Sequence, residues 1–211
     1  MQIAIDGPAG SGKTSVARAL ARRFGCLLVN TGAMYRAVAL GLSQGLKLSA
    51  IQIEIRPDER VLLNGKDVTE QLYTPQIDEL ASQVAARPEV REFLIAQQRA
   101  IAHTRDVVME GRDIGSVVLP NADVKIYLDA SPEERARRRC QERPGLSYEE
   151  VLTQLRARDA RDGQGFGRLQ ITPDTVIIRS DGRSLDDVIA EAVRTVEAAL
   201  QGRKLSGKLN G

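Results

Sequence analysis

The chain has 211 residues, 42% of them hydrophobic, and a formal net charge of only +2, so it suits one domain and gives no electrostatic reason to expect nucleic acid as a partner. It has no charged-then-apolar leader and no apolar run of membrane-span length, and its two cysteines, Cys26 and Cys140, form no metal or redox motif. These features predict a cytoplasmic protein without a membrane partner.

The first predicted strand, QIAI at residues 2–5, leads into a segment that fits the pattern G-x-x-x-x-G-K-[ST] of a phosphate-binding loop. Glycines in such a loop let consecutive backbone N–H groups surround a polyphosphate. We expect Lys13 to reach the β and γ phosphates and Thr14 to offer its hydroxyl to Mg²⁺. Apolar residues from Val16 to Phe24 predict the helix that must follow, with Gly25 as its cap. The nucleotide-binding loop therefore comprises Gly7, Pro8, Ala9, Gly10, Ser11, Gly12, Lys13 and Thr14.

The next predicted strand, CLLV at residues 26–29, is followed by Thr31, Gly32 and a helix that carries Arg36 in its first turns. Ligands of open α/β sheets collect at this end of the strands, where an arginine can bind phosphate with two hydrogen bonds. Residues 51–68 then predict a small hairpin with a turn in NGKD, followed by helices at about 74–86 and 88–104. Residues 41–104 are thus predicted to form an insertion beside an acceptor site.

Three further apolar runs follow: DVVM at 106–109, VKIYLD at 124–129 and TVIIRS at 175–180. Their alternation with helical stretches predicts an α/β, doubly wound parallel sheet covered by helices. Arginine-rich helices at about 132–171 predict a lid over a nucleotide, and a final helix spans about 185–200. The predicted core is therefore 1–40, 105–131 and 172–201, with a frayed tail at 202–211.

Signatures of two other classes of phosphate-loop protein are missing. Guanine-specific enzymes read their base with N-K-x-D, whereas NGKD at 64–67 has the lysine one place out and lies in the predicted turn. The LSGGQ signature of transporter ATPases does not occur either. Both absences favour a small-molecule kinase.

The blocks IDGPAGSGKT, NTGAMYRAVAL, ASQVAARPEVR, EGRDIGSVVLPNADVKIYLDAS and RARDARD resemble the bacterial cytidylate kinases, a family of nucleoside monophosphate kinases, over about residues 2–200. The resemblance implies transfer of the γ-phosphoryl group of ATP to CMP or dCMP. It also implies a five-stranded parallel core, a monophosphate-binding insertion and a mobile lid. We expect a monomer whose partners are these small-molecule nucleotides.

The resemblance also implies roles for individual residues of the acceptor site. It puts Tyr35 against the sugar, Ser82 and Arg91 on cytosine, Arg112 on the CMP phosphate and Asp113 on cytosine. In the lid it implies that Arg158 contacts the CMP phosphate and Asp162 the ribose. The expected substrate-binding residues are therefore Thr31, Tyr35, Arg36, Ser82, Arg91, Arg112, Asp113, Arg158 and Asp162.

Glu110 follows the central strand DVVM at the position that holds Mg²⁺ through water in phosphate-loop enzymes. The family often has aspartate there. We expect Thr14 and Glu110 to form the metal site, with the longer glutamate shifting the charge by one methylene group.

The lid arginines are candidates for neutralising charge during transfer, because phosphoryl transfer mainly needs alignment and spread positive charge. Arg135 and Arg139 are assigned to the nucleotide, and Arg158 and Arg161 join Lys13 and Arg112 as catalytic residues. A solvated helix face or a nucleic-acid patch would also account for RARRR. The family usually has another arginine where this chain has Gly165, and Arg168 further along is the candidate replacement.

Two alternative functions stay open at this point. One is a related phosphate-loop kinase that acts on UMP or another small acceptor. The other is a nucleotide-binding switch or RNA-associated protein that uses ATP occupancy alone, which only the arginine-rich lid and the basic tail support. The acceptor residues would be unexplained in that second case.

Overall fold

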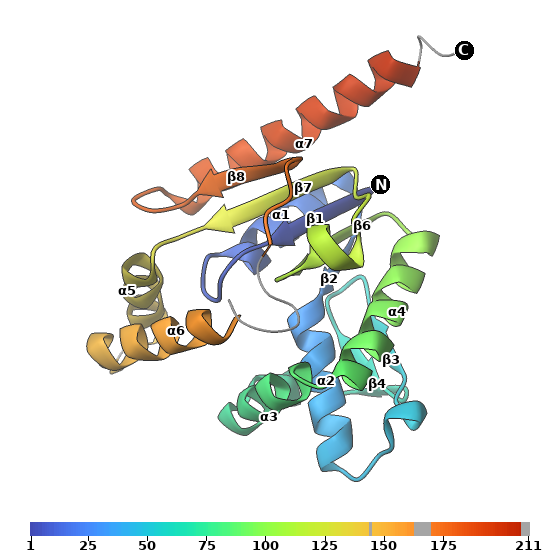
Figure 1. The fold of residues 1–211 in the computed structure, drawn as a ribbon, viewed down its shortest axis with the longest axis vertical. Coiled ribbons are helices and arrows are strands. Elements are labelled where there is room, and N and C mark those ends of the chain that lie inside the picture. The colour runs from blue at the N-terminus through green and yellow to red at the C-terminus, as the bar shows by residue number, and fades with distance from the viewer. Residues whose placement is uncertain (144, 163–169, 208–211) are drawn as a thin grey trace.

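The computed structural model describes residues 1–143, 145–162 and 170–207, and the side chains of 161, 162 and 203–207 fall outside that description. Its centre is a five-stranded sheet of order β2-β6-β1-β7-β8 in which all four pairings are parallel (Figure 1). The fold class predicted from the sequence is therefore confirmed. The strands are β1 (Gln2–Asp6), β2 (Leu27–Asn30), β6 (Val107–Gly111), β7 (Val124–Asp129) and β8 (Thr175–Arg179).

Side-chain alternation along the strands separates two hydrophobic clusters. Ile3 and Ile5 of β1 pack in the cluster shared with α1 (Lys13–Phe24) and α7 (Leu185–Gly207). Ala4, between them, packs in the other cluster with α2 (Thr31–Ser43) and α4 (Pro88–Thr104). Gly25 caps α1 in the left-handed conformation, as predicted. Helices thus cover both faces of the sheet.

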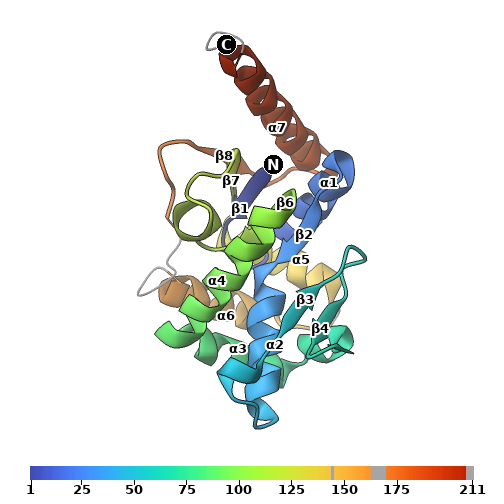
Figure 2. The same ribbon diagram turned by 90° about the vertical axis from the view of Figure 1, so that its right-hand side faces the viewer.

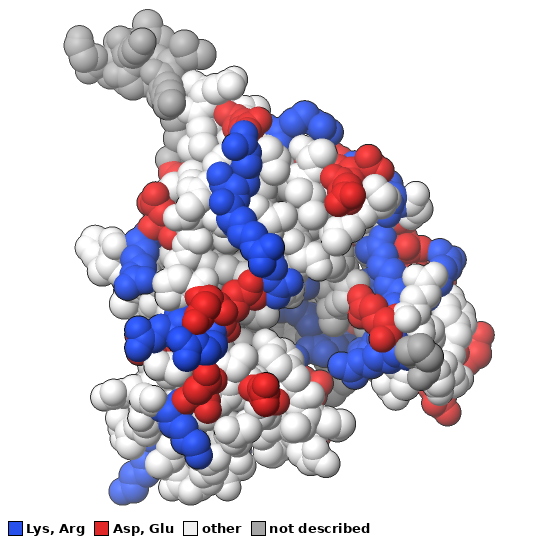
Figure 3. All heavy atoms as spheres, turned by 180° about the vertical axis from the view of Figure 1, so that it is seen from behind, with Lys and Arg blue, Asp and Glu red and all other residues white. Residues whose placement is uncertain are grey.

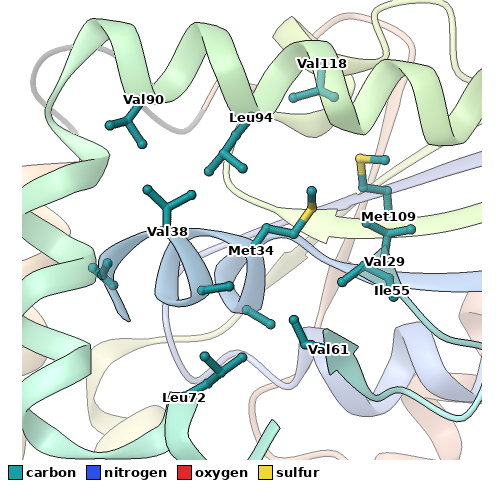
Figure 4. Close-up of a cluster of buried hydrophobic side chains, with 14 of the residues drawn as sticks. Val29, Met34, Val38, Ile55, Val61, Leu72, Val90, Leu94, Met109 and Val118 are labelled. Carbon is teal, nitrogen blue, oxygen red and sulfur yellow. The ribbon is translucent and has the colours of Figure 1, made fainter. Parts of the chain in front are cut away.

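The insertion between β2 and β6 packs on the second cluster. Figure 2 shows α4 and the hairpin on opposite sides of α2, and Figure 4 shows their apolar side chains converging. Asn64 and Gly65 have φ of 50° and 81°, which confirms the predicted turn. The insertion also contains the 3₁₀ turns Leu48–Ala50 and Thr69–Tyr73, the strands β3 (Ile53–Ile55), β4 (Val61–Leu63) and β5 (Lys66–Asp67), and helix α3 (Pro75–Ala85).

The arginine-rich segment between β7 and β8 forms two helices, α5 (Pro132–Glu142) and α6 (Tyr148–Asp162), beside one end of the sheet (Figure 1). These helices share a small apolar cluster of their own, made of Ala136, Val151, Leu152 and Leu155. Packing between α5 and α6 therefore does not depend on the two main clusters.

Helix α7 is longer than the sequence pattern indicates. We expect it to end near residue 200 and a frayed tail to follow, but the helix continues to Gly207, so that prediction is wrong over 202–207. A single glycine such as Gly202 costs a helix only about 1 kcal/mol, and the next residues, Arg203, Lys204 and Leu205, favour helix. Residues 208–211 of the predicted tail lie outside the described residues. None of the helices that the structure describes is both long and apolar enough to cross a membrane.

Candidate active site

The loop of residues 7–14 connects the central strand β1 to α1 at the carboxyl end of the sheet. A Cβ on Gly7 would lie 2.3 Å from the Leu128 carbonyl oxygen of β7, so only glycine fits there. Gly10 and Gly12 have φ of 77° and 93°, in the left-handed region that favours glycine. The glycines thus fix the backbone that cradles a phosphate.

Lys13 lies buried at the start of α1, with its Nζ donating to the Pro8 carbonyl oxygen at 2.7 Å. Burial lowers the pKa of Lys13 to about 8, while the nearby Glu110 acts in the opposite direction. The ammonium group is therefore held inside the loop by a carbonyl, where an anionic phosphate would be a better partner.

Thr14 and Glu110 bring a hydroxyl and a carboxylate together. Thr14 Oγ1 donates to Glu110 Oε1 at 2.6 Å, from α1 to the end of β6. Thr31 Oγ1, at the start of α2, donates to the Glu110 carbonyl oxygen at 2.8 Å. Hard oxygen donors of this kind suit Mg²⁺, which keeps several waters and substrate oxygens around itself. In the described part of the chain, no group of three or more His, Cys, Asp or Glu could hold a metal on its own.

Three of the predicted acceptor residues meet beside the end of β6. Asp113 is 7% exposed and pairs with Arg91 of α4, whose other nitrogen donates to the Tyr35 hydroxyl at 3.4 Å. Burial raises the pKa of Tyr35 to about 12, so this hydroxyl stays protonated. A carboxylate and a guanidinium, side by side and largely buried, can bind a polar planar group with several donors and acceptors.

Arg36 reaches the insertion through two residues that we did not predict. Its guanidinium pairs with Asp78 of α3, with an N···O distance of 2.7 Å, and its central carbon lies 5.3 Å from the centre of the Tyr73 ring. Ser82, by contrast, is exposed on α3. Asp78 could not be assigned from the sequence, because 42 residues separate it from Arg36 and only the fold brings the two side chains together.

Arg135, predicted to contact the nucleotide, is on α5 of the lid, where it is 2% exposed and lies against the phosphate loop. It donates to the Ala130 and Ala9 carbonyl oxygens at 2.9 and 3.0 Å and forms an ion pair with Asp159 of α6. Arg135 therefore touches the loop through a backbone carbonyl. Arg139, one turn further along α5, is half-buried.

Positive charges gather where the lid faces the end of β6. Burial lowers the pKa of Arg112 to about 10, and the nearby Arg158 acts in the same direction. Figure 3 shows Lys and Arg side chains around a hollow on this side of the molecule. Arg161 and Asp162 end α6, but their side chains lie outside the description, as do Gly165 and Arg168 entirely.

Asp6 is a buried site residue that sequence reasoning missed. It ends β1 directly before the phosphate loop, and its two carboxylate oxygens accept from Ile114 N and Gly115 N, each at 2.8 Å. An aspartate at the end of an apolar strand was the available signal. A cavity of about 520 Å³ lies away from these residues, beside α7 and the first residues of β7 and β8.

Comparisons with known proteins agree with this geometry. A family model described as cytidylate kinase matches residues 3–198. A cytidylate kinase from Solibacter usitatus (strain Ellin6076) is 42% identical over 223 residues, covering 97% of this chain and 96% of that protein. One from Fervidobacterium nodosum (strain ATCC 35602 / DSM 5306 / Rt17-B1) is 44% identical, covering 93% of this chain and 96% of its own.

The solved structures that resemble this chain are more distant in sequence. A gluconokinase from Sinorhizobium meliloti 1021 has a TM-score of 0.56 at 16% identity, covering 97% of this chain and 96% of its own. A shikimate kinase from Bacteroides thetaiotaomicron has a TM-score of 0.51 at 14% identity, covering 95% and 98%. At such identities the likeness concerns the fold alone.

Proposed function

The chain belongs to the cytidylate kinase family, and from this premise we propose how it transfers the γ-phosphoryl group of ATP to CMP or dCMP, giving ADP and CDP or dCDP. One observation carries the proposal: the glycine loop, the Thr14–Glu110 pair and the Arg91–Asp113 pair all lie at the carboxyl end of the central strands. They would serve the donor phosphates, the metal and the acceptor base.

The loop of residues 7–14 binds the donor phosphates through its backbone N–H groups and the start of α1. Lys13 exchanges the Pro8 carbonyl oxygen for the β and γ phosphates of ATP. Because phosphate is an anion and the carbonyl is not, this exchange favours the charged lysine, whose pKa burial has lowered to about 8.

Thr14 and Glu110 fit Mg²⁺, because their oxygens already lie 2.6 Å apart at the mouth of the loop. Thr14 would offer its hydroxyl and Glu110 its carboxylate, directly or through water. Mg²⁺ supplies neutralisation of the phosphate charge when bound. Thr31 holds the backbone of Glu110 in place through the carbonyl oxygen of that residue.

The acceptor nucleotide lies between the insertion and the end of β6. Asp113 accepts from the cytosine amino group, Arg91 and Ser82 bind the rest of the base, and Tyr35 lies against the sugar. Arg36 leaves Asp78 to bind the CMP phosphate. Arg112 and Arg158, which are close enough to interact electrostatically, would bind the same phosphate. Asp162 would bind the ribose.

Transfer itself needs alignment and positive charge more than covalent chemistry. Lys13, Arg112, Arg158 and Arg161 neutralise the charge that spreads over the transferred group. We expect the insertion, 41–104, to close over CMP and the lid, 132–171, over ATP, excluding water that would otherwise hydrolyse ATP. Arg135 connects the lid to the phosphate loop, because it donates to the Ala9 carbonyl oxygen of the loop and pairs with Asp159 of α6 in the lid. Arg139, one turn further along α5, would bind the nucleotide.

We propose that the protein acts as a monomer in the cytoplasm. The site residues that the proposal assigns all belong to one chain, which supports a monomer. Cys26 and Cys140 are free thiols, which fits a reducing compartment.

The test is ADP formation from Mg-ATP with CMP, dCMP, UMP, AMP or GMP offered separately, and with no acceptor. We expect CMP and dCMP to be preferred and the enzyme to be nearly idle without an acceptor. Equal turnover of UMP would favour a kinase of broader acceptor range. ADP formation that no acceptor changes would instead favour a switch that uses ATP alone.

A further inference from the structure

The acceptor residue Asp113 stands immediately before a single wide π-helical turn, Ile114–Val118. The backbone N–H groups of Val117 and Val118 donate back to the Asp113 carbonyl oxygen, and Leu119 N donates to Ile114 O at 2.7 Å. The first N–H groups of a helical turn have no partner within the turn itself. Those of Ile114 and Gly115 must therefore be satisfied from elsewhere.

An aspartate in the position of Asp113 usually caps its own turn by accepting from the N–H group of the second or third residue of the turn, here Gly115 or Ser116. Here its side chain makes no such bond and pairs with Arg91 instead. Asp6 takes over the capping role from another strand, with one carboxylate oxygen on Ile114 N and the other on Gly115 N, both at 2.8 Å. The Asp113 carboxylate is consequently free of a capping role and can face a ligand together with its partner Arg91.

The surroundings of Asp6 allow little displacement. Asp6 is only 5% exposed. A Cβ on Gly115 would lie 3.2 Å from the Lys125 side chain and 3.4 Å from Asp6 Oδ2, so the turn packs directly on the carboxylate. Asp6 is also adjacent to Gly7, whose Cα lies close against the Leu128 carbonyl group, so the same residue joins the donor loop to the acceptor turn.

We propose that Asp6 is a positioning residue that holds the turn after Asp113 and thereby leaves the Asp113 carboxylate, paired with Arg91, to select the acceptor base instead of capping the turn. The inference rests on the proposed function, in which Asp113 reads cytosine. Both Asp6 oxygens must accept, and an amide of the same shape has only one acceptor and turns a donor toward the second N–H group.

The first test is steady-state kinetics of Asp6→Asn with CMP and with UMP, at saturating ATP, and with ATP varied at saturating CMP. We expect kcat/KM for CMP to fall by about 10-fold or more and the CMP-to-UMP preference to narrow. The KM for ATP should stay within about twofold of the wild-type value, because the loop keeps its own contacts. A larger rise in the KM for ATP than in that for CMP would overturn the proposal.

The matched control is Asp123→Asn, at the other end of the sheet. Asp123 accepts from Gln2 N at 2.5 Å, so this change also replaces a carboxylate that binds backbone on β1 but leaves the acceptor turn untouched. We expect the control to keep the wild-type CMP-to-UMP preference. If it narrowed the preference as much as Asp6→Asn does, the effect would belong to the strand in general.

The double variant Asp6→Asn/Asp113→Asn separates this inference from the function on which it rests. If Asp6 acts through Asp113, the double variant has the same CMP-to-UMP preference as Asp113→Asn alone. Effects that multiply independently would overturn the positioning role. If Asp113→Asn alone left the CMP-to-UMP preference unchanged, the proposal that Asp113 recognises cytosine would be wrong. The inference about Asp6 depends on that proposal and would then be wrong too.

Amide hydrogen exchange of the wild-type protein tests the contact without any variant, should Asp6→Asn not fold. We expect the Ile114 and Gly115 amides to exchange far more slowly than unprotected amides, because both are buried on the Asp6 carboxylate. Exchange at the rate of exposed amides would contradict the proposal.

Discussion

Thr14 and Glu110, 96 residues apart in the chain, are joined by a hydroxyl-to-carboxylate hydrogen bond of 2.6 Å. The bond links the first turn of α1, at the end of the phosphate loop, to the carboxyl end of β6. Because β1 and β6 are neighbours in the sheet, the two oxygens meet where a triphosphate leaves the loop. The pair therefore defines the expected metal position.

Thr14→Val removes the hydroxyl while keeping the shape of the side chain. We expect kcat to fall by about 10- to 100-fold and the Mg²⁺ concentration for half-maximal activity to rise, since the metal would lose a ligand. Thr14→Ser is the matched control because it keeps the hydroxyl, and it should retain most of the activity. Mg²⁺ titrations of both variants make the comparison, and equal loss in the two would contradict the metal role.

Asp159→Asn should destabilise the protein more than Glu133→Gln, although each change neutralises one acid of an ion pair between α5 and α6. Arg135, the partner of Asp159, is 2% exposed, whereas Arg156, the partner of Glu133, is 61% exposed. We expect a loss of about 1–3 kcal/mol for Asp159→Asn and little change in stability for Glu133→Gln, because solvent screens an exposed ion pair. Urea unfolding at pH 7 measures both, and equal losses would contradict a buried anchor in the lid.

The fold could be predicted from the sequence because its signals are local. Each strand is indicated by an apolar run, and each helix by apolar residues at helical spacing, within the segment that forms it. Gly25 likewise marks the end of α1 from its position directly after the helix. The end of α7 could not be predicted, because polar helix formers after Gly202 allow helix without any packing signal. Helix boundaries depend on small free-energy differences that tertiary contacts do not always decide.

The candidate site was predictable where a motif sets the spacing, as in the loop that ends with Lys13 and Thr14. Tyr35, Arg91 and Asp113 were assigned by resemblance, and they do lie together. Asp6 and Asp159 were missed because their partners are 108 and 24 residues away. Such pairings form only when the sheet and the lid have folded, so no local sequence pattern predicts them.

The stability of wild type relative to Asp6→Asn should increase on acidification from pH 7 to pH 5. Burial raises the pKa of Asp6 in the folded protein to about 6, with Asp113 acting in the same direction and Lys13 against it. The folded state therefore binds a proton more readily than the unfolded state, and the cost of burying the ionised group is relieved as the pH falls through 6. The expected relative gain is about 1 kcal/mol.

Urea unfolding of both proteins at pH 7 and pH 5 gives this difference directly. Titratable groups far from Asp6 behave alike in wild type and variant, so their contributions cancel in the comparison. A difference in unfolding free energy that does not depend on pH would contradict a raised pKa at Asp6.

The central claim, phosphoryl transfer to a cytosine nucleotide recognised by Asp113, is tested most directly by kcat/KM for CMP and for UMP in wild type and Asp113→Asn. A carboxylate accepts from the cytosine amino group but meets a second acceptor on uracil. We therefore expect wild type to prefer CMP, and Asp113→Asn to narrow that preference by about 5- to 150-fold, or roughly 1–3 kcal/mol. Equal loss of both rates would show that Asp113 acts on phosphate, metal or structure, and would contradict this account of cytosine recognition.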